Sequence, residues 1–320
     1  MFLDIFNLNM NYNQFYFTRK YWQLFRLSVV SWGFLWEICK YLGTFWILIE
    51  PISFFSEKFA NTMKPWGPVI LLISIGLAIF NSKPKLKYKF FIPDKDVYIN
   101  LVIGDILSLK NKDVIIPTNT HFITDLSNDL ISPKSLQGQF TKKYYSSNPN
   151  HLDTDINAAL VDTPFTNLEP SFFGKVRKYG IGTIAKINVG KNGNKLFNTY
   201  FFAVANMNAN KVCQSNVSEF RIALADLWTF IHDKGEFSDL AIPILGSGFC
   251  RIDASREELY RDILQSFLFA LNGSNFCKSL TFVIYYKDIA EMNIDLDSLC
   301  VMTEFYASNF VKKQTVGVAA

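Results

Sequence analysis

The chain has 320 residues, of which 49% are hydrophobic and 19% are charged, and its formal net charge is +4. A typical soluble domain has about 25% charged residues, so this composition excludes a mostly disordered chain. The average conceals two different parts. Residues 1–90 hold 10 Lys/Arg and 4 Asp/Glu, a net charge of +6, whereas residues 91–320 hold 22 Lys/Arg and 24 Asp/Glu, a net charge of −2.

The first apolar run covers residues 27–49 and predicts a transmembrane helix. Only two of its 23 residues are charged. At about 1.5 Å per residue the run is about 34 Å long, enough for a hydrocarbon core of about 30 Å. It is too long and starts too late for a signal peptide, and it lacks a small-residue cleavage site. The alternative is a buried helix of a soluble protein.

A second apolar run, residues 66–80, has no charged residue and predicts a second transmembrane helix. Its length of about 22 Å is short for a full span, so we expect it to thin the bilayer or to be extended by the stem of Lys83. Residues 1–26 are then an N-terminal segment, residues 50–65 a short external loop and residues 81–95 a basic linker.

The charges around these two runs predict an orientation. Three basic residues precede the first run and four follow the second, whereas the loop between the runs has two basic and two acidic residues. Loops with an excess of Lys and Arg remain on the cytoplasmic side. We therefore expect a multi-pass hairpin with both termini in the cytoplasm.

Glu37 and Lys40 fall near the middle of the first run and share one helix face. Charges at the centre of a bilayer are costly and usually face other helices or water. Two interpretations remain open: the helix is shifted or tilted and the pair is neutralised locally, or the pair lines an oligomer interface or a pore. Ser74 and Ala78 form a small-xxx-small pair that favours helix packing.

Residues 96–310 have the pattern of a soluble α/β domain, and residues 311–320 are a small, polar tail. Apolar runs predict strands at residues 98–103, 113–119, 240–245 and 280–286, and a hairpin at residues 179–204. Helical periodicity is present at residues 133–145, 215–232 and 255–271. Together these elements predict a mixed sheet flanked by helices.

Several chemistries are excluded by the motifs. The five Cys residues form no CxxC pair and the three His residues are scattered, so we expect no metal and no cofactor. Residues 180–185 match a GxGxxA fingerprint but begin a β-rich run instead of a helix. The slightly acidic soluble part lacks the basic footprint of a nucleic-acid-binding protein.

Three loops follow predicted strands and could hold a diphosphate: residues 104–105, 117–122 and 245–249. Glycine lets a backbone approach a ligand closely, and ligands of open α/β sheets lie at the carboxyl ends of strands. Arg251 follows the third loop, where a guanidinium can reach a phosphate. The alternative is that Asp105 caps a turn and that Asn119 and Thr120 are turn formers.

Three stretches resemble the landmarks of macro domains, in the same order: residues 102–106 (VIGDI), 113–119 (DVIIPTN) and 242–249 (IPILGSGF). Macro domains bind ADP-ribose and related nucleotides. The resemblance covers residues 96–290 and implies an α/β macro-domain-like fold, a mixed sheet flanked by helices, preceded here by a two-helix transmembrane hairpin. It also implies a ligand-binding set: Asp105, Ile106, Thr118, Asn119, Thr120, Gln137, Gly138, Gly246, Ser247, Gly248, Phe249 and Arg251.

The resemblance assigns roles to three of these places. Asp105 would contact the adenine amino group, the 246–249 loop would bind the diphosphate through its N–H groups, and Asn119 would lie near the distal ribose. Hydrolytic macro domains carry Asn-Ala-Ala-Asn and then a triple glycine, whereas this chain has Pro-Thr-Asn-Thr at residues 117–120 and no triple glycine. We therefore expect binding without catalysis. The alternatives are a membrane-tethered ADP-ribosyl hydrolase, a non-catalytic ADP-ribose-binding scaffold and a membrane-anchored scaffold whose pocket is vestigial.

A membrane hairpin ahead of such a domain resembles the membrane-anchored macro-domain effectors of type II Thoeris anti-phage defence. Residues 118–122 and 135–138 also resemble that group. The resemblance implies a TIR-domain partner that makes histidine–ADP-ribose from NAD and acts through this small-molecule product. It further implies a homo-oligomer in the bacterial inner membrane, with Glu37 and Lys40 in the membrane part, that disrupts the lipid bilayer and contacts no nucleic acid.

Overall fold

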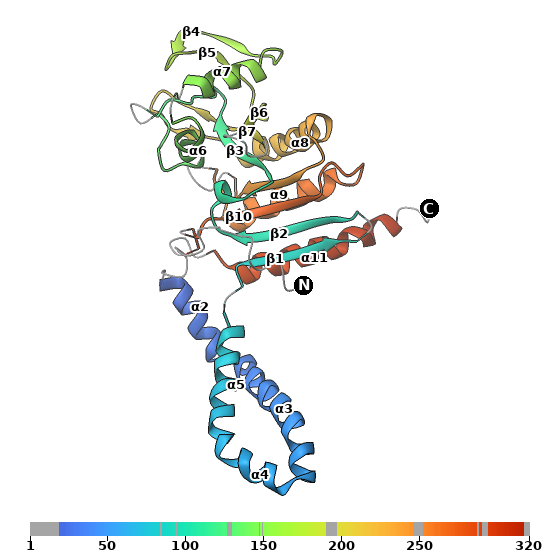
Figure 1. Cartoon of the computed structure of the whole chain (residues 1–320). Helices are drawn as coiled ribbons and strands as arrows, with labels where there is room; N and C mark the ends of the chain where they lie inside the picture. Colours follow the sequence, from blue (N-terminus) through green and yellow to red (C-terminus); the bar gives the residue numbers. More distant parts are fainter. Residues whose placement is uncertain are drawn as a thin grey trace. The chain divides into compact units, whose positions relative to one another are not determined.

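The computed structural model describes residues 19–83, 85–93, 95–126, 130–146, 148, 150–189, 197–245, 252–286, 288–289 and 294–316. The chain divides into two units (Figure 1), one at Tyr12–Leu86 and one that contains Lys87–Ala320. Each unit is described by itself.

The first unit is a series of helices: α2 (Arg19–Val29), α3 (Trp32–Phe55), α4 (Glu57–Met63), the 3-10 turn η1 (Lys64–Trp66) and α5 (Gly67–Asn81). Ser31 begins α3, because its hydroxyl accepts a hydrogen bond from the Phe34 N–H. The helix predicted over residues 27–49 is therefore interrupted at residues 30–31. The loop predicted at residues 50–65 is almost entirely helical, because α3 continues to Phe55 and Ser56 then caps α4.

The hairpin of α3 and α5 has almost no core of its own. None of the residues of α3 is buried, and α5 buries only Ser74 and Ala78, the small pair expected at a helix contact. Trp32, Trp36 and Phe55 are among the large apolar side chains that stay exposed. In the part of the chain that the structure describes, the segments Trp32–Phe55 and Glu57–Asn81 are long and apolar enough to cross a membrane.

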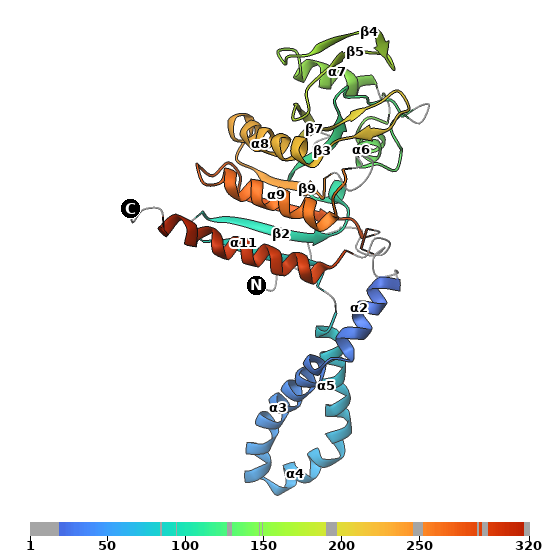
Figure 2. The same cartoon turned by 180° about the vertical axis from the view of Figure 1, so that it is seen from behind.

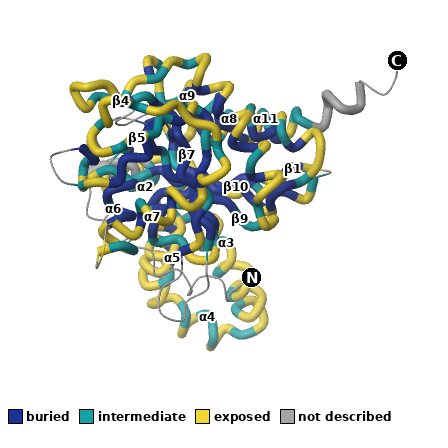
Figure 3. Tube along the Cα trace, turned by 90° about the horizontal axis from the view of Figure 1, so that it is seen from above, coloured by how far each residue is buried: buried dark blue, intermediate teal, exposed yellow. Residues whose placement is uncertain are grey.

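In the described residues, the second unit is built on a mixed sheet of eight strands. Seven of them have the order β1-β2-β10-β9-β3-β7-β6, and the eighth, β8, pairs with β7. The strands are β1 (Lys87–Ile92), β2 (Val97–Ile103), β3 (Asp113–Asn119), β6 (Ile184–Val189), β7 (Phe197–Met207), β8 (Cys213–Gln214), β9 (Asp239–Pro243) and β10 (Ser279–Ile284). The five strands β2, β10, β9, β3 and β7 run parallel. They are the most deeply buried, as their apolar runs predict (Figure 3).

Helices cover both faces of this sheet (Figure 2). One face carries α8 (Val217–Lys234), α9 (Arg256–Ala270) and α11 (Leu296–Val316), and the other carries α6 (Leu136–Tyr144) and α7 (Asn150–Ala159). Trp228 and Phe267 pack edge to face on the first side, and Phe140 and Phe201 do so on the second. A separate two-stranded sheet is formed by β4 (Thr166–Phe172) and β5 (Lys175–Lys178).

Two predicted boundaries are wrong. Residues 87–92 were expected in a basic linker, but they form β1, which pairs antiparallel with β2 at the edge of the sheet. Lysines on an edge strand discourage pairing with other chains, which accounts for the basic composition. Residues 311–316 were expected in the tail, but α11 continues to Val316, because its sequence has no Pro or Gly before residue 317.

Candidate ligand-binding site

A cavity of about 600 Å³ lies at the carboxyl ends of the parallel strands. Its lining comes from the segment after β2 (Gly104, Asp105, Ile106), the end of β3 (Pro117, Thr118, Asn119), the end of β9 (Pro243, Ile244) and the end of β10 (Val283, Ile284, Tyr285). Residues 130–137, which lead into α6, form another wall. A cavity of this size and position is typical of a small-molecule site in an α/β fold.

Asp105 both caps a turn and lines the cavity. Its Oδ1 accepts a hydrogen bond of 2.9 Å from the Leu107 N–H and so begins the 3-10 turn η2 (Ile106–Ser108). Its second oxygen, Oδ2, has no hydrogen bond to a described residue and is available to a donor in the cavity. Ile106 is buried beside it and adds apolar surface to the wall.

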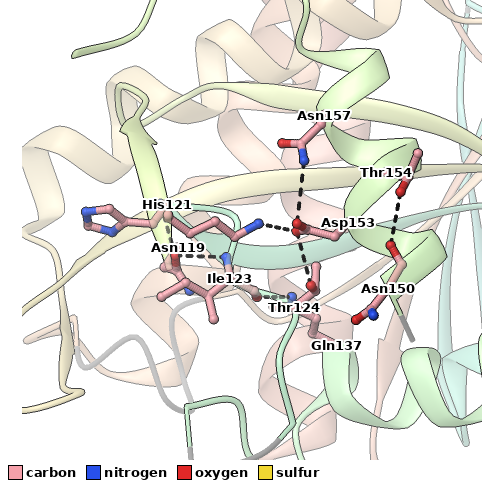
Figure 4. A network of polar contacts seen from close by, with 10 residues as sticks. Asn119, His121, Ile123, Thr124, Gln137, Asn150, Asp153, Thr154 and Asn157 are labelled. Atoms are coloured by element: carbon pink, nitrogen blue, oxygen red, sulfur yellow. Dashed lines mark hydrogen bonds and ion pairs between the residues drawn. The ribbon is translucent and has the colours of Figure 1, made fainter. Parts of the chain in front are cut away.

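Thr118 and Asn119 reach the cavity from the end of β3. The Thr118 hydroxyl is buried without a hydrogen-bond partner among the described residues. The Asn119 Oδ1 accepts from the N–H groups of His121, at 3.0 Å, and Ile123, at 3.5 Å (Figure 4). This carbonyl oxygen therefore holds the loop after β3, and only the amide nitrogen of Asn119 is left for other contacts.

Gln137 lines the cavity, but its amide nitrogen is also engaged, since it donates a 2.7 Å hydrogen bond to the Ile123 carbonyl oxygen. Gly138 and Thr120, two other predicted site residues, are absent from the lining. A Cβ on Gly138 would lie 2.2 Å from the Ser132 carbonyl oxygen, so glycine is needed for packing. The Thr120 hydroxyl donates to the Asn206 Oδ1 instead.

The structure thus brings five predicted residues to one cavity: Asp105, Ile106, Thr118, Asn119 and Gln137. Five others lie outside the described residues: Gly246, Ser247, Gly248, Phe249 and Arg251. Thr120 and Gly138 are absent from the lining of this cavity, and their role in ligand binding stays a prediction.

Sequence reasoning missed the part of the lining that comes from the end of β7 and from β8, which contains Met207, Lys211 and Cys213. Burial raises the pKa of the Cys213 thiol above its usual value, so this side chain is an uncharged, apolar wall element at neutral pH. A usable signal was present, because the turn-forming residues 208–210 (Asn-Ala-Asn) directly follow a buried strand.

His121 lies behind the wall and is absent from the cavity lining. Its ring stacks on Phe172 of β4 with 4.4 Å between ring centroids. Burial, assisted by the charge of Lys178, lowers the pKa of His121 to about 4, so the imidazole is neutral at pH 7. In the described part of the chain, no group of three or more His, Cys, Asp or Glu side chains is placed to hold a metal ion.

The Glu37–Lys40 pair lies near one end of α3. Because α3 begins at Trp32, Glu37 is in the second turn of this helix, and its depth in a membrane stays a prediction. The Lys40 Nζ is 3.1 Å from the Glu37 Oε2, and the Asn81 Nδ2 donates to the same oxygen at 3.3 Å. Asn81 also donates to the Tyr41 hydroxyl. This geometry agrees with local neutralisation of the pair, and a role in an oligomer or a pore stays a prediction.

Comparison with known proteins gives a family, a relative and two similar solved structures. The sequence model of the family described as Thoeris protein ThsA, Macro domain, matches residues 99–285. A Thoeris protein ThsA of Bacillus amyloliquefaciens (strain Y2) is 24% identical over 240 residues, which are 70% of this chain and 76% of that protein.

Two solved macrodomains are also similar. That of Oceanobacillus iheyensis with ADP has a TM-score of 0.43 and 11% identity, covering 71% of this chain and 97% of that chain. That of Trypanosoma brucei in complex with ADP-ribose has a TM-score of 0.40 and 10% identity, covering 64% and 67%.

Proposed function

The chain belongs to the Thoeris ThsA macro-domain family, and from this premise we propose that its cavity binds an ADP-ribose derivative that acts as a defence signal. The observation that carries the proposal is the cavity at the carboxyl ends of β2, β10, β9 and β3. The Oδ2 of Asp105 has no hydrogen bond to a described residue and, beside the apolar surface of Ile106, suits an adenine ring with its amino group. The Thr118 hydroxyl is buried with no partner among the described residues and suits a polar group farther along the ligand.

Binding without hydrolysis fits the geometry of Asn119. A hydrolytic residue would need an oxygen that can accept from a water or a ribose hydroxyl. The Asn119 Oδ1 already accepts from two backbone N–H groups of the wall. Incubation with an ADP-ribosylated protein is expected to release no ADP-ribose, and release at a rate comparable to a hydrolytic macro domain would support the alternative of a tethered hydrolase.

The membrane part of the proposal depends on the α3–α5 hairpin. It exposes aromatic and aliphatic side chains along both helices, and its small residues are the buried ones. Lipid tails are a more favourable surrounding for such a surface than water is. We expect the hairpin to insert into the bacterial inner membrane with both ends in the cytoplasm, and the bound signal to change its packing so that the membrane is disrupted.

The signal is proposed to come from a TIR-domain protein that makes histidine–ADP-ribose from NAD. A ligand shifts an equilibrium only as far as its affinity differs between two states. The chain must therefore have a resting and an activated arrangement, and we expect the activated one to be a homo-oligomer. A scaffold whose cavity takes no nucleotide is the competing function.

Calorimetry on the full chain in lipid nanodiscs tests the ligand. ADP-ribose, histidine–ADP-ribose and AMP are titrated separately. We expect both ADP-ribose compounds to bind, with the histidine conjugate binding more tightly, and AMP to bind more weakly than either. If none of the three binds, the scaffold function is favoured and the sensing function fails.

Dye release from liposomes tests the effector role. Liposomes with the full chain are expected to leak only after the histidine conjugate is added, and AMP serves as the ligand control. Leakage that does not depend on the conjugate would contradict ligand control of the hairpin.

A further inference from the structure

A network of polar contacts holds the segment of residues 119–124, which begins at the end of β3 with Asn119, a residue of the cavity lining. On the cavity side, Asn119 and Gln137 hold the N–H and the carbonyl oxygen of Ile123, respectively. Both side chains line the cavity, so the position of this backbone segment sets where they lie (Figure 4). A contact that fixes this backbone segment therefore affects the shape of the cavity.

Asp153 of α7 makes a contact with this backbone segment through the side chain of Thr124. The Thr124 Oγ1 lies 3.2 Å from the Asp153 Oδ1, and the Lys175 Nζ of β5 forms an ion pair with the same oxygen. The Asn157 Nδ2 is 3.5 Å from the other oxygen. One carboxylate thus joins the segment of residues 119–124, α7 and the β4–β5 sheet, and Figure 4 shows its contacts with Thr124 and Asn157.

The β4–β5 sheet makes a second contact with the segment of residues 119–124, because Phe172 of β4 stacks on His121. Lys175 is mostly buried, with 17% of its side chain exposed, so its charge depends on Asp153 for a partner. Hydrogen bonds to an ionised carboxylate are roughly twice as strong as neutral ones. Replacing the carboxylate by an amide would weaken the hold on Thr124 and leave the Lys175 ammonium unpaired.

We propose that Asp153, which is absent from the cavity lining, is a positioning residue for the ligand site. It fixes the segment of residues 119–124 through Thr124, and it links that segment to the β4–β5 sheet through Lys175. This inference rests on the proposed ligand-binding function of the cavity. The expected consequence is a change of ligand affinity caused by a side chain that touches no ligand.

The test uses the full chain in nanodiscs and ADP-ribose as the probe. Asp153→Asn is expected to raise the Kd for ADP-ribose by about 5- to 50-fold, in the range of ordinary coupling between sites. Asp155→Asn is the matched control on the same helix, because its carboxylate is exposed and bonds only to the Tyr145 hydroxyl among the described residues. Asp155→Asn is expected to keep the wild-type Kd.

A second pair of variants separates positioning from folding. Thr124→Ser keeps the hydroxyl and is expected to bind as the wild type does, whereas Thr124→Val removes it and is expected to raise the Kd. The combination Asp153→Asn/Thr124→Val should bind no more weakly than the weaker single variant, because both changes break one contact. This pair carries the test if Asp153→Asn does not fold.

Hydrogen exchange of the ligand-free protein provides a readout that does not need the ligand. The amides of His121 and Ile123 are expected to exchange faster in Asp153→Asn, while those of α8 and α9 keep their rates. If the wild type binds ADP-ribose and Asp153→Asn binds it equally with unchanged exchange, the positioning role is overturned and the proposed function stands. If the wild type binds no ADP-ribose, the proposed function fails, and the exchange rates alone decide the positioning role.

Discussion

Thr118 and Thr199 both have a buried hydroxyl group and can be compared with each other. Both lack a hydrogen-bond partner among the described residues, but only Thr118 lines the cavity. Replacing either by Val removes a buried, unsatisfied polar group, so we expect each variant to keep or gain stability, by up to about 1 kcal/mol. Thermal unfolding of the full chain measures this.

The same two variants should differ in ligand binding. Thr118→Val is expected to raise the Kd for ADP-ribose by about 5- to 10-fold, the loss of one ordinary hydrogen bond. Thr199→Val, on β7 and away from the cavity, should leave the Kd unchanged. Equal weakening by both variants would show that the effect comes from the sheet and not from a contact with the ligand.

His121 predicts a component of the pH dependence of stability. Its pKa of about 4 in the folded protein is below the usual value of 6.5, so the fold favours the neutral ring. The stability that this preference contributes is complete above pH 6.5 and is lost as the pH falls from 6.5 towards 4. The slope from one such group is at most about 1.4 kcal/mol per pH unit.

His121→Phe keeps a ring for stacking on Phe172 and removes the titration. Relative to the wild type, its free energy of unfolding is expected to rise as the pH is lowered from 7 to 5, measured by chemical denaturation. A wild-type curve parallel to that of His121→Phe would contradict the assignment.

At the scale of elements, the start of α6 depends on a close approach that only glycine permits. A Cβ at Gly138 would lie 2.2 Å from the Ser132 carbonyl oxygen, which belongs to the backbone and cannot move alone. Gly138→Ala is expected to destabilise the protein by about 1–3 kcal/mol and to weaken ligand binding, because Gln137 shifts with α6. Gly180→Ala, whose Cβ would meet nothing closer than 4.0 Å, is the control for both measurements.

The helices and strands that could be predicted from the sequence are those with a clear local signal in their own residues. β2, β3, β9 and β10 are short apolar runs, and α9 carries a capping box between Ser255 and Glu258. β1 was missed because its lysines alternate with aromatic residues and so resemble a charged linker. Its strand identity depends on pairing with β2, which is tertiary information.

The candidate site divides in the same way. Asp105 and Asn119 follow apolar strands and could be placed at one edge of a parallel sheet before the fold was known. The hydrogen bonds of the Asn119 oxygen and the Gln137 nitrogen could not be predicted from the sequence, because they depend on the position of the Ile123 backbone in the folded chain. The place of Glu37 near one end of α3 follows from Ser31, which is the N-cap of this helix.

At the scale of the whole molecule, the proposed topology predicts which lysine positions can be reached from outside the cell. The positive-inside rule places Lys58 outside and Lys85 in the cytoplasm. In intact cells, a membrane-impermeant maleimide is expected to label a Lys58→Cys variant and to spare a Lys85→Cys variant. Lysis should make the second variant reactive, and the reverse pattern would overturn the orientation.

The pairing of β2 with β10 also determines the order in which the two units can fold during synthesis. Asn100 and Thr281, bonded across these strands, are 181 residues apart, so this pairing forms only after residue 281 has been made. A ribosome adding about 5–20 residues per second needs on the order of 10–40 s to pass from the end of α5 to the end of β10.

During that interval the hairpin is finished and can enter the membrane while no cavity exists. A hairpin that was damaging by default, and merely restrained by its sensor, would injure the cell each time a new chain was made. For the membrane-disrupting function proposed above, the long-range pairing therefore favours a hairpin that is harmless on its own and becomes damaging only after the folded domain has bound its ligand.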